Sequence, residues 1–167
     1  MAGGSLGVGG AITTPTYVQT DGLLNGAGSL TVTQSFSKSG GTLGMTGPLS
    51  ITQTSGNLVF SNPTALTLGA VSTVSGAIDI TATGGLTTTV PVAANGGVLK
   101  LTALSPINVG SGGLSSTGDM TLTAMTPSPS SIIRLDGALV SGGNVTLLAY
   151  AGIIQNASIS GQNIDAT

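Results

Sequence analysis

The chain contains no histidine, cysteine, tryptophan or glutamate, and it has few charged residues of either sign. Its 167 residues include three Lys or Arg and five acidic residues, all of them Asp. Imidazole, thiolate and glutamate carboxylate are groups that enzymes commonly use to move protons, attack substrates or bind metals. Because these groups are missing, we expect no enzyme: no catalytic residue, no metal site and no cofactor.

Charge and aromatic content are both low. The net charge is −2, and aromatic residues make up 2% of the chain. Nucleic-acid binding depends on a cationic stripe that contacts phosphates and, for single strands, on aromatic side chains that stack on bases. We therefore expect no nucleic-acid partner.

The sequence also lacks the patterns of a membrane-spanning helix and of a signal peptide. No uninterrupted apolar stretch reaches the roughly 18 residues of a spanning helix, so we expect no membrane insertion. The opening residues MAGGSLGVGG lack the basic part and the continuous apolar part of a signal peptide. We expect any secretion signal to lie outside this segment.

Small residues dominate what is present. Gly, Thr and Ser account for 28, 25 and 20 positions, and 40% of the residues are hydrophobic. That hydrophobic content excludes the ordinary disordered tail, which combines low hydrophobicity with high net charge. The length suits a single domain.

A short phrase recurs along the chain, in which an apolar residue, a polar one and a second apolar one are usually followed by Thr. The starts of successive phrases are 19, 29, 21, 21 and 25 residues apart, and the longest gap suggests a degenerate turn of the repeat around LTLG at 66–69. Spacings near 20 residues are typical of stacked β units. The phrases are LTVT at 30–33, LSIT at 49–52, IDIT at 78–81, LKLT at 99–102, MTLT at 120–123 and VTLL at 145–148.

This pattern predicts an all-β parallel β-solenoid of roughly six to eight coils. Almost no helix is expected, because no window of a dozen residues has apolar spacings of three and four. Gly, Thr, Ser and Val are also poor helix formers. Gly pairs at 84–85, 96–97, 112–113 and 142–143 fall between the phrases, where we expect corners that need residues tolerant of positive φ.

Alternation assigns the phrase residues to two faces of their strands. One face should form a continuous core ladder, and the other an outer Thr ladder with Asp79 and Lys100 as a cross-strand ion pair. The predicted core ladder is Leu30, Val32, Leu49, Ile51, Ile78, Ile80, Leu99, Leu101, Met120, Leu122, Val145 and Leu147. The predicted Thr ladder is Thr33, Thr52, Thr81, Thr102 and Thr123.

The two ends of the chain depart from the repeat. Residues 1–27 are Gly-rich and include the turn-prone TTPT at 13–16, so we predict an N-terminal cap or flexible arm before a solenoid domain at 28–167. At the other end, QNIDAT from Gln162 looks like the start of another repeat. A solenoid normally closes with a polar cap, so this ending favours excision from a longer array.

Three segments carry a family resemblance: GAIDITATGG at 76–85, GDMTLTA at 118–124 and SGGNVTLLAYAGIIQNASISG at 141–161. They resemble the degenerate repeats of filamentous haemagglutinin-type exoproteins, the large adhesins secreted by the two-partner route, over about residues 28–167. The secretion domain of that family carries Asn-Pro-Asn motifs, which Asn62-Pro63-Thr64 does not match, so no secretion residue is carried over.

The resemblance implies a right-handed parallel β-helix that forms part of an extracellular or cell-surface bacterial fibre. It implies adhesion or aggregation as the activity, with the rest of a longer exoprotein and a receptor or glycan on a host or neighbouring cell as partners. The main alternative is a self-assembling fibre or phage tail component, in which end coils associate end to end.

Other functions remain open as weaker alternatives. Right-handed β-helices include polysaccharide-cleaving enzymes, and the candidates for such a site are Asp119, Asp136 and Arg134. The alternative for these charged residues is an ion pair or a solvated corner without catalytic function. Repeated Thr-x-Thr strings resemble those of ice-binding solenoids, but Ser50, Asp79 and Lys100 interrupt the array.

The local motifs that contain Asn or Gly are explained better by a structural role than by a modification or binding site. Asn144-Val145-Thr146 and Asn156-Ala157-Ser158 match the glycosylation pattern, but corner hydrogen bonding or a stacked amide ladder explains these Asn residues better. We expect the Gly-rich residues 3–10 to form a flexible linker rather than a phosphate-binding loop, because no helix follows them.

Overall fold

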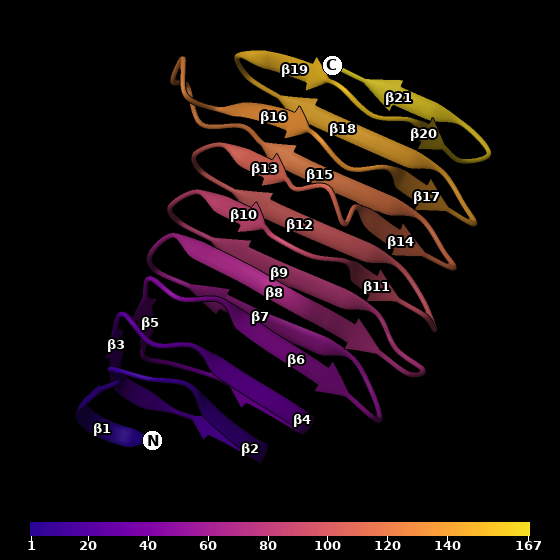
Figure 1. Cartoon of the computed structure of the whole chain (residues 1–167). Coiled ribbons are helices and arrows are strands. Elements are labelled where there is room, and N and C mark those ends of the chain that lie inside the picture. The colour runs from indigo at the N-terminus through magenta and orange to yellow at the C-terminus, as the bar shows by residue number, and fades with distance from the viewer.

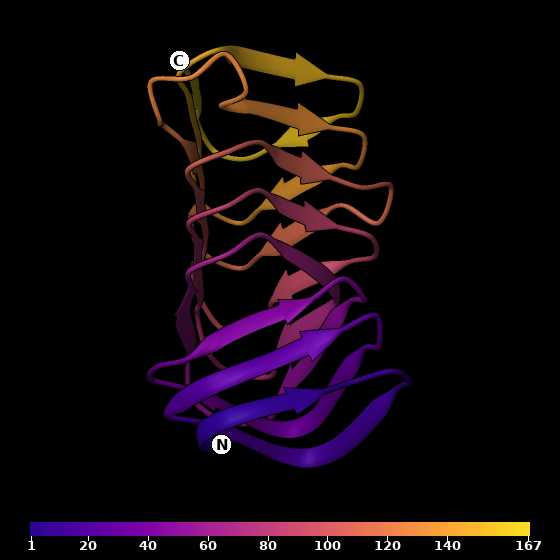
Figure 2. The ribbon, with the colours of Figure 1, turned by 90° about the vertical axis from the view of Figure 1, so that its left-hand side faces the viewer.

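The computed structural model describes all residues from Met1 to Thr167 and contains strands but no helix. The strands stack into a parallel β-solenoid of about eight coils (Figure 1). In Figure 2 the chain rises from the N-terminus to the C-terminus while the strands that face the viewer run from left to right, which makes the solenoid right-handed. The predicted fold class is confirmed.

The first four coils contain two strands each. They are β1 (Ala2–Gly7) with β2 (Ile12–Gln19), β3 (Asp21–Gly26) with β4 (Leu30–Lys38), β5 (Thr42–Met45) with β6 (Leu49–Gln53), and β7 (Leu58–Asn62) with β8 (Leu66–Thr73).

The later coils contain three shorter strands each, and β21 (Ile164–Ala166) begins one more. They are β9 (Ile78–Ala82), β10 (Leu86–Thr88) and β11 (Val92–Ala94); β12 (Leu99–Ala103), β13 (Ile107–Val109) and β14 (Leu114–Ser116); β15 (Met120–Ala124), β16 (Ile132–Leu135) and β17 (Leu139–Ser141); and β18 (Val145–Ala149), β19 (Gly152–Gln155) and β20 (Ile159–Ser160).

Three sheets form the walls. Sheet A contains β1, β3 and β5, and sheet C contains β7, β9, β12, β15, β18 and β21. Sheet B runs through β2, β4, β6 and β8 and then divides, because the long strand β8 pairs with both β10 and β11 of the next coil. Only sheet B connects the first three coils to the coils that follow.

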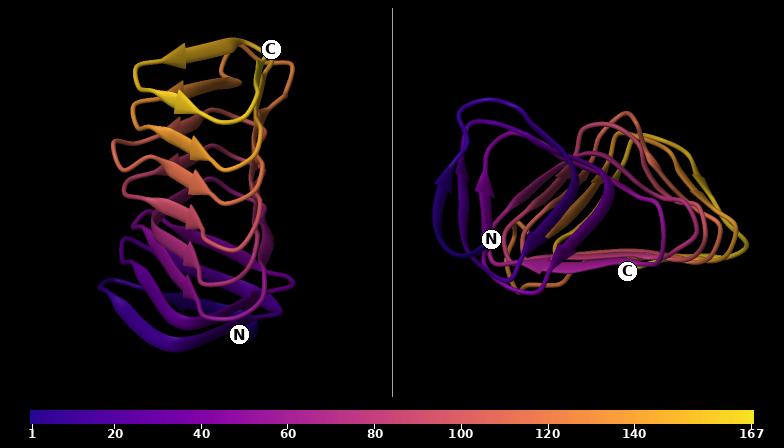
Figure 3. Two further views of the ribbon diagram at one scale, coloured as in Figure 1. Left: turned by 90° about the vertical axis from the view of Figure 1, so that its right-hand side faces the viewer. Right: turned by 90° about the horizontal axis from the view of Figure 1, so that it is seen from below.

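The cross-section of the solenoid therefore changes at β7 and β8. Seen from below in Figure 3, the outline of the N-terminal coils is displaced from that of the later coils. The register between β6 and β8 is broken at the same level: Leu49 faces Leu68 but Ile51 faces Val71, so Ser50 lies opposite the two residues Gly69 and Ala70. A bulge of this kind bends a strand and increases its twist.

The six phrases do not form one column, so the prediction of a single core ladder is wrong. Leu30 and Leu49 stack in sheet B, whereas Ile78, Leu99, Met120 and Val145 stack in sheet C. In sheet C the residue below Ile78 is Leu58, and LTLG at 66–69 is the strand that stacks on the 49–52 phrase. The long gap between phrases holds β7 and β8, and alternation alone does not say which wall a strand joins.

All twelve residues of the predicted ladder are nevertheless buried, and they belong to one core cluster of 35 buried residues. Burial of aliphatic side chains at about 25 cal/mol per Å² stabilises the stacking of the coils. Three of the four aromatic residues also pack together. The rings of Tyr17 and Phe36 are stacked with centroids 5.4 Å apart, and those of Phe36 and Phe60 are tilted with centroids 4.9 Å apart.

Residues 1–27 form the first strands of the stack. Strand β2 pairs with β4, and β1 pairs with β3, which in turn pairs with β5. The carbonyl oxygen of Met1 accepts hydrogen bonds from the backbone N–H groups of Thr20 and Asp21, which ties the end of the chain to the next coil. The segment is thus part of the solenoid, with the first coil and the start of the second, and not a flexible arm.

The glycine pairs do lie at corners, but the expected reason for them is wrong. Of the eight residues in these four pairs, only Gly113 has a positive φ. The first glycine of each pair instead approaches the backbone of the previous coil, as at Gly84, where a Cβ would lie 2.4 Å from the Ala65 nitrogen. These corners need glycine because a side chain does not fit between coils.

Candidate functional site

The outer face of sheet C carries the predicted ion pair. Asp79 and Lys100 are register partners on β9 and β12, and Lys100 Nζ lies 3.6 Å from Asp79 Oδ2. Both side chains are at least one-third exposed. Exposed pairs of this kind contribute about 0–1 kcal/mol.

Removal of this pair is expected to have a small effect. In a double-mutant cycle with Asp79→Ala and Lys100→Ala, we expect a coupling energy below about 1 kcal/mol, measured by urea denaturation. The coupling should fall further in high salt, because exposed charges are screened. A salt-insensitive coupling of several kcal/mol would contradict this.

The outer Thr ladder is shorter than predicted. Thr81, Thr102 and Thr123 stack in consecutive strands of sheet C, with Ser61 below them and Leu148 above. The other two predicted members lie in sheet B: Thr52 faces Ser72, and Thr33 lies on β4. The reason is the same as for the core ladder, since early and late phrases occupy different walls.

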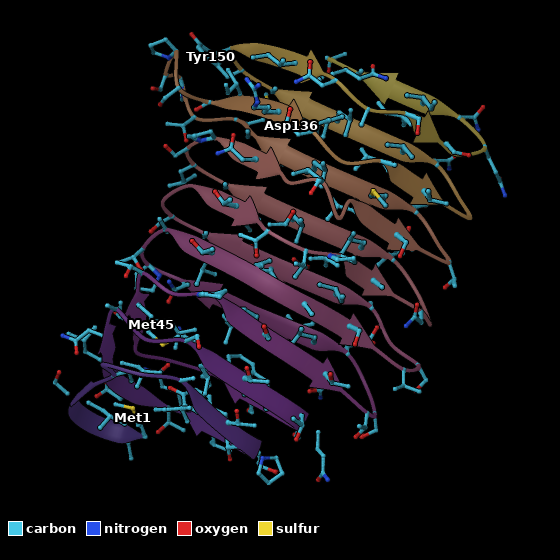
Figure 4. The ribbon with its side chains drawn as sticks, in the orientation of Figure 1. Met1, Met45, Asp136 and Tyr150 are labelled. Atoms are coloured by element: carbon cyan, nitrogen blue, oxygen red, sulfur yellow. The ribbon has the colours of Figure 1, made fainter.

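Arg134 and Asp136 form an exposed cluster with Asn156. Asp136 lies just past the end of β16 (Figure 4). Arg134 Nε donates to Asp136 Oδ2 at 2.9 Å, and Asn156 Nδ2 donates to Asp136 Oδ1 at 2.6 Å. These hydrogen bonds, first that of Asn156 and then that of Arg134, lower the pKa of Asp136. The cluster thus holds a carboxylate in its ionised form at a corner.

Asp119 and Asp136 lie at different corners of the coil. Asp119 precedes β15 of sheet C, where its Oδ1 accepts a hydrogen bond of 2.8 Å from the backbone N–H of Asn144. Asp136 follows β16 of sheet B. The structure has no group of three acidic, His or Cys residues that could hold a metal ion, and it contains no pocket.

The two Asn residues of the glycosylation patterns are engaged at corners, as the corner interpretation predicts. Asn163 Nδ2 donates to Asn144 Oδ1 at 2.8 Å, which forms a short amide ladder. Asn156 donates to Asp136 in the cluster described above. Both side chains therefore connect neighbouring coils.

A buried polar site lies at the level of β7 and β8, where the cross-section changes, and it was not predicted from the sequence. Asn62, at the end of β7, is 1% exposed. Its Oδ1 accepts from the backbone N–H of Leu43 at 2.8 Å, and its Nδ2 donates to the Leu43 carbonyl oxygen at 2.9 Å. Since β5 is the last strand of sheet A, the amide replaces the strand that would otherwise pair there.

Lys38 and Gln53 act in a similar way on neighbouring edges. Lys38, 8% exposed, donates through Nζ to the carbonyl oxygens of Gly41 at 2.8 Å and Ser61 at 2.7 Å. Gln53 Oε1 accepts from the backbone N–H of Phe36 at 2.9 Å. We refer to Lys38, Gln53 and Asn62 as the junction cluster.

A signal for the junction cluster does exist in the sequence. In LVFSN at 58–62, alternation places Asn62 on the same face as Leu58 and Phe60, so a polar side chain is expected inside. Buried amides need partners for both their donors and their acceptor. What the sequence does not provide is the identity of that partner, Leu43 in a different sheet.

Stability should reach its maximum near pH 10, because one buried group and one half-buried group titrate in opposite senses. Burial lowers the pKa of Lys38 below its usual 10.5, so between the two values the unfolded chain binds more protons and stability rises with pH. Burial raises the pKa of Tyr17 to about 12, so above its usual 10.0 the unfolded chain loses the proton first and stability falls.

Urea midpoints measured from neutral to strongly alkaline pH will test this profile. Lys38→Met should remove the rising part, and Tyr17→Phe should remove the falling part. A profile that both variants leave unchanged would show that other groups control the pH dependence.

Comparisons with protein-family models, with curated proteins and with solved structures found no match to this chain. The structure has no helix long and apolar enough to span a bilayer.

Proposed function

We propose that the chain is a non-enzymatic structural segment of a bacterial surface or secreted adhesin, acting as a rigid stalk and as a surface for cell adhesion or aggregation. The stacking of about eight coils over one continuous core carries this proposal. At every interface except that between the third and fourth coils, backbone hydrogen bonds run along the axis in two or three parallel columns, so a load along the axis is shared between them.

The outer surface supports the proposed role in cell adhesion or aggregation. Sheet C presents mainly small hydroxyl side chains and one ion pair, with Val59 and Leu148 among them, on a face six strands long. Such a face offers repeated hydrogen-bonding groups at the rung spacing of about 4.8 Å. Sugars and polar protein surfaces are the ligands that match it, and the expected partners are a receptor or glycan on a host or neighbouring cell. The expected location is extracellular.

Single-molecule pulling between the two termini tests the stalk. We expect discrete lengthening events, each releasing one or more whole coils, at about 70 Å of extended chain for each coil of roughly 20 residues. Smooth extension at low force, without discrete events, would argue against a load-bearing stalk.

Adhesion needs a separate measurement. Beads coated with the chain should attach to cultured epithelial cells or to one another, and Thr102→Asp and Thr123→Asp together should weaken attachment. Thr67→Asp with Thr87→Asp, on the outer face of sheet B, is the matched control. Failure of coated beads to attach to cells or to each other would remove the adhesive part of the proposal.

Axial self-assembly into a fibre is the alternative function. The coil at the N-terminal end has the long strands β1 and β2. At the C-terminal end, the outermost strands are the short β19 and β20 together with β21 of sheet C. The outlines of the two ends differ in Figure 3, which disfavours stacking one copy on another. Analytical ultracentrifugation over a range of concentrations should show one species for a stalk and growing polymers for a fibre subunit.

A further inference from the structure

The interface between the third and fourth coils has less backbone pairing than the interfaces above it. Between later coils, three strands pair with three, as in β12 with β15, β13 with β16 and β14 with β17. Between the third and fourth coils, only β6 pairs with β8, and the register of that pair is broken at Ser50. Strand β5 ends sheet A here and β7 begins sheet C.

Side chains take the place of the missing strand pairs at this interface. Asn62 reaches from the fourth coil to both backbone groups of Leu43, and Lys38 reaches from the second coil to the Ser61 carbonyl oxygen. These are a few bonds from single, rotatable side chains, whereas each ladder between later coils extends over two to five consecutive residues.

The charge at this interface adds a further difference. The Lys38 ammonium group is buried, and its hydrogen-bond partners are two neutral carbonyl oxygens. No ion pair of the chain includes Lys38. Burial of an uncompensated cation opposes the folded arrangement.

We propose that this interface is a fault line, at which residues 1–53 separate and unfold as one unit while the coils from Leu58 onward remain folded. In a solenoid, stability is close to a sum of coil terms and nearest-neighbour interface terms, so the weakest interface sets the boundary of local opening. The inference does not depend on the stalk function. In a chain under tension, the fault line would release the first three coils before the rest.

Hydrogen exchange in increasing urea tests the proposal on the whole chain. We expect the amides of β2, β4 and β6 to lose protection together, at a lower urea concentration than those of β9, β12 and β15. Protection that is equal on both sides of residue 53, or that is lost coil by coil from the N-terminus, overturns the proposal.

A disulfide across the interface provides the matched variant, because the chain has no cysteine of its own. Thr52→Cys with Ser72→Cys joins register partners on β6 and β8, and Thr102→Cys with Thr123→Cys joins register partners on β12 and β15 as the control. Oxidation of the first pair should merge the two unfolding steps into one, and reduction of the same sample should restore them. Oxidation of the control pair should leave two steps. If both disulfides act alike, or neither changes the number of steps, the fault line is not at this interface.

Discussion

Replacement of Asn62 by Leu is expected to destabilise the protein strongly. The change keeps the size of the side chain but removes both hydrogen bonds to Leu43. The Leu43 C=O keeps the hydrogen bond that Thr64 Oγ1 donates to it, whereas the Leu43 N–H lies buried beside an apolar group. A buried backbone group without a partner costs about 1–3 kcal/mol, so we expect a loss of about that size in the free energy of unfolding. Urea denaturation with a fitted m-value measures this cost.

Asn57→Leu is the matched control for that experiment. Asn57 Oδ1 also accepts a backbone hydrogen bond between coils, from Ala77 at 2.9 Å, but this bond is exposed. Water replaces it when the amide is removed, so the expected cost is below about 1 kcal/mol. Equal costs for the two variants would mean that the buried edge of β5 is not what Asn62 stabilises.

Gly76→Ala is the second change with a large expected effect. Gly76 lies at the corner before β9, where a Cβ would be 2.0 Å from the carbonyl oxygen of Gly56 in the previous coil. Backbone cannot move aside as a flexible side chain can, so the coils must separate locally. Overpacking of this kind typically costs about 1–3 kcal/mol and occasionally more.

Gly9→Ala controls for the loss of glycine itself. A Cβ at Gly9 would have no heavy atom within 4 Å, and its φ is not positive. We expect little change or a slight stabilisation from the reduced entropy of the unfolded chain. Thermal unfolding of both variants separates the effect of close approach from that of backbone freedom. If Gly76→Ala melts like Gly9→Ala, the corner has room that the structure does not show.

The sequence could have predicted part of the candidate site and not the rest. Asp79 and Lys100 occupy equivalent positions in phrases 21 residues apart, and such positions become register partners when coils of that length stack. The junction cluster has no such periodicity. Its members come from three different strands, and their partners lie in neighbouring strands that no repeat aligns with them.

The sequence by itself determined the class of fold and the inward and outward faces. Period-two alternation with repeated glycine corners specifies short strands with one apolar side, and all twelve predicted inward residues are buried. Only the tertiary structure decided which wall each strand joins. Leu49 and Ile78 have the same alternating context, yet they lie in sheets B and C, because wall assignment depends on the length of the intervening coil and on contacts far apart in the chain. The buried partners of Lys38 and Asn62 follow from that assignment, since they close the sheet edges that it leaves open.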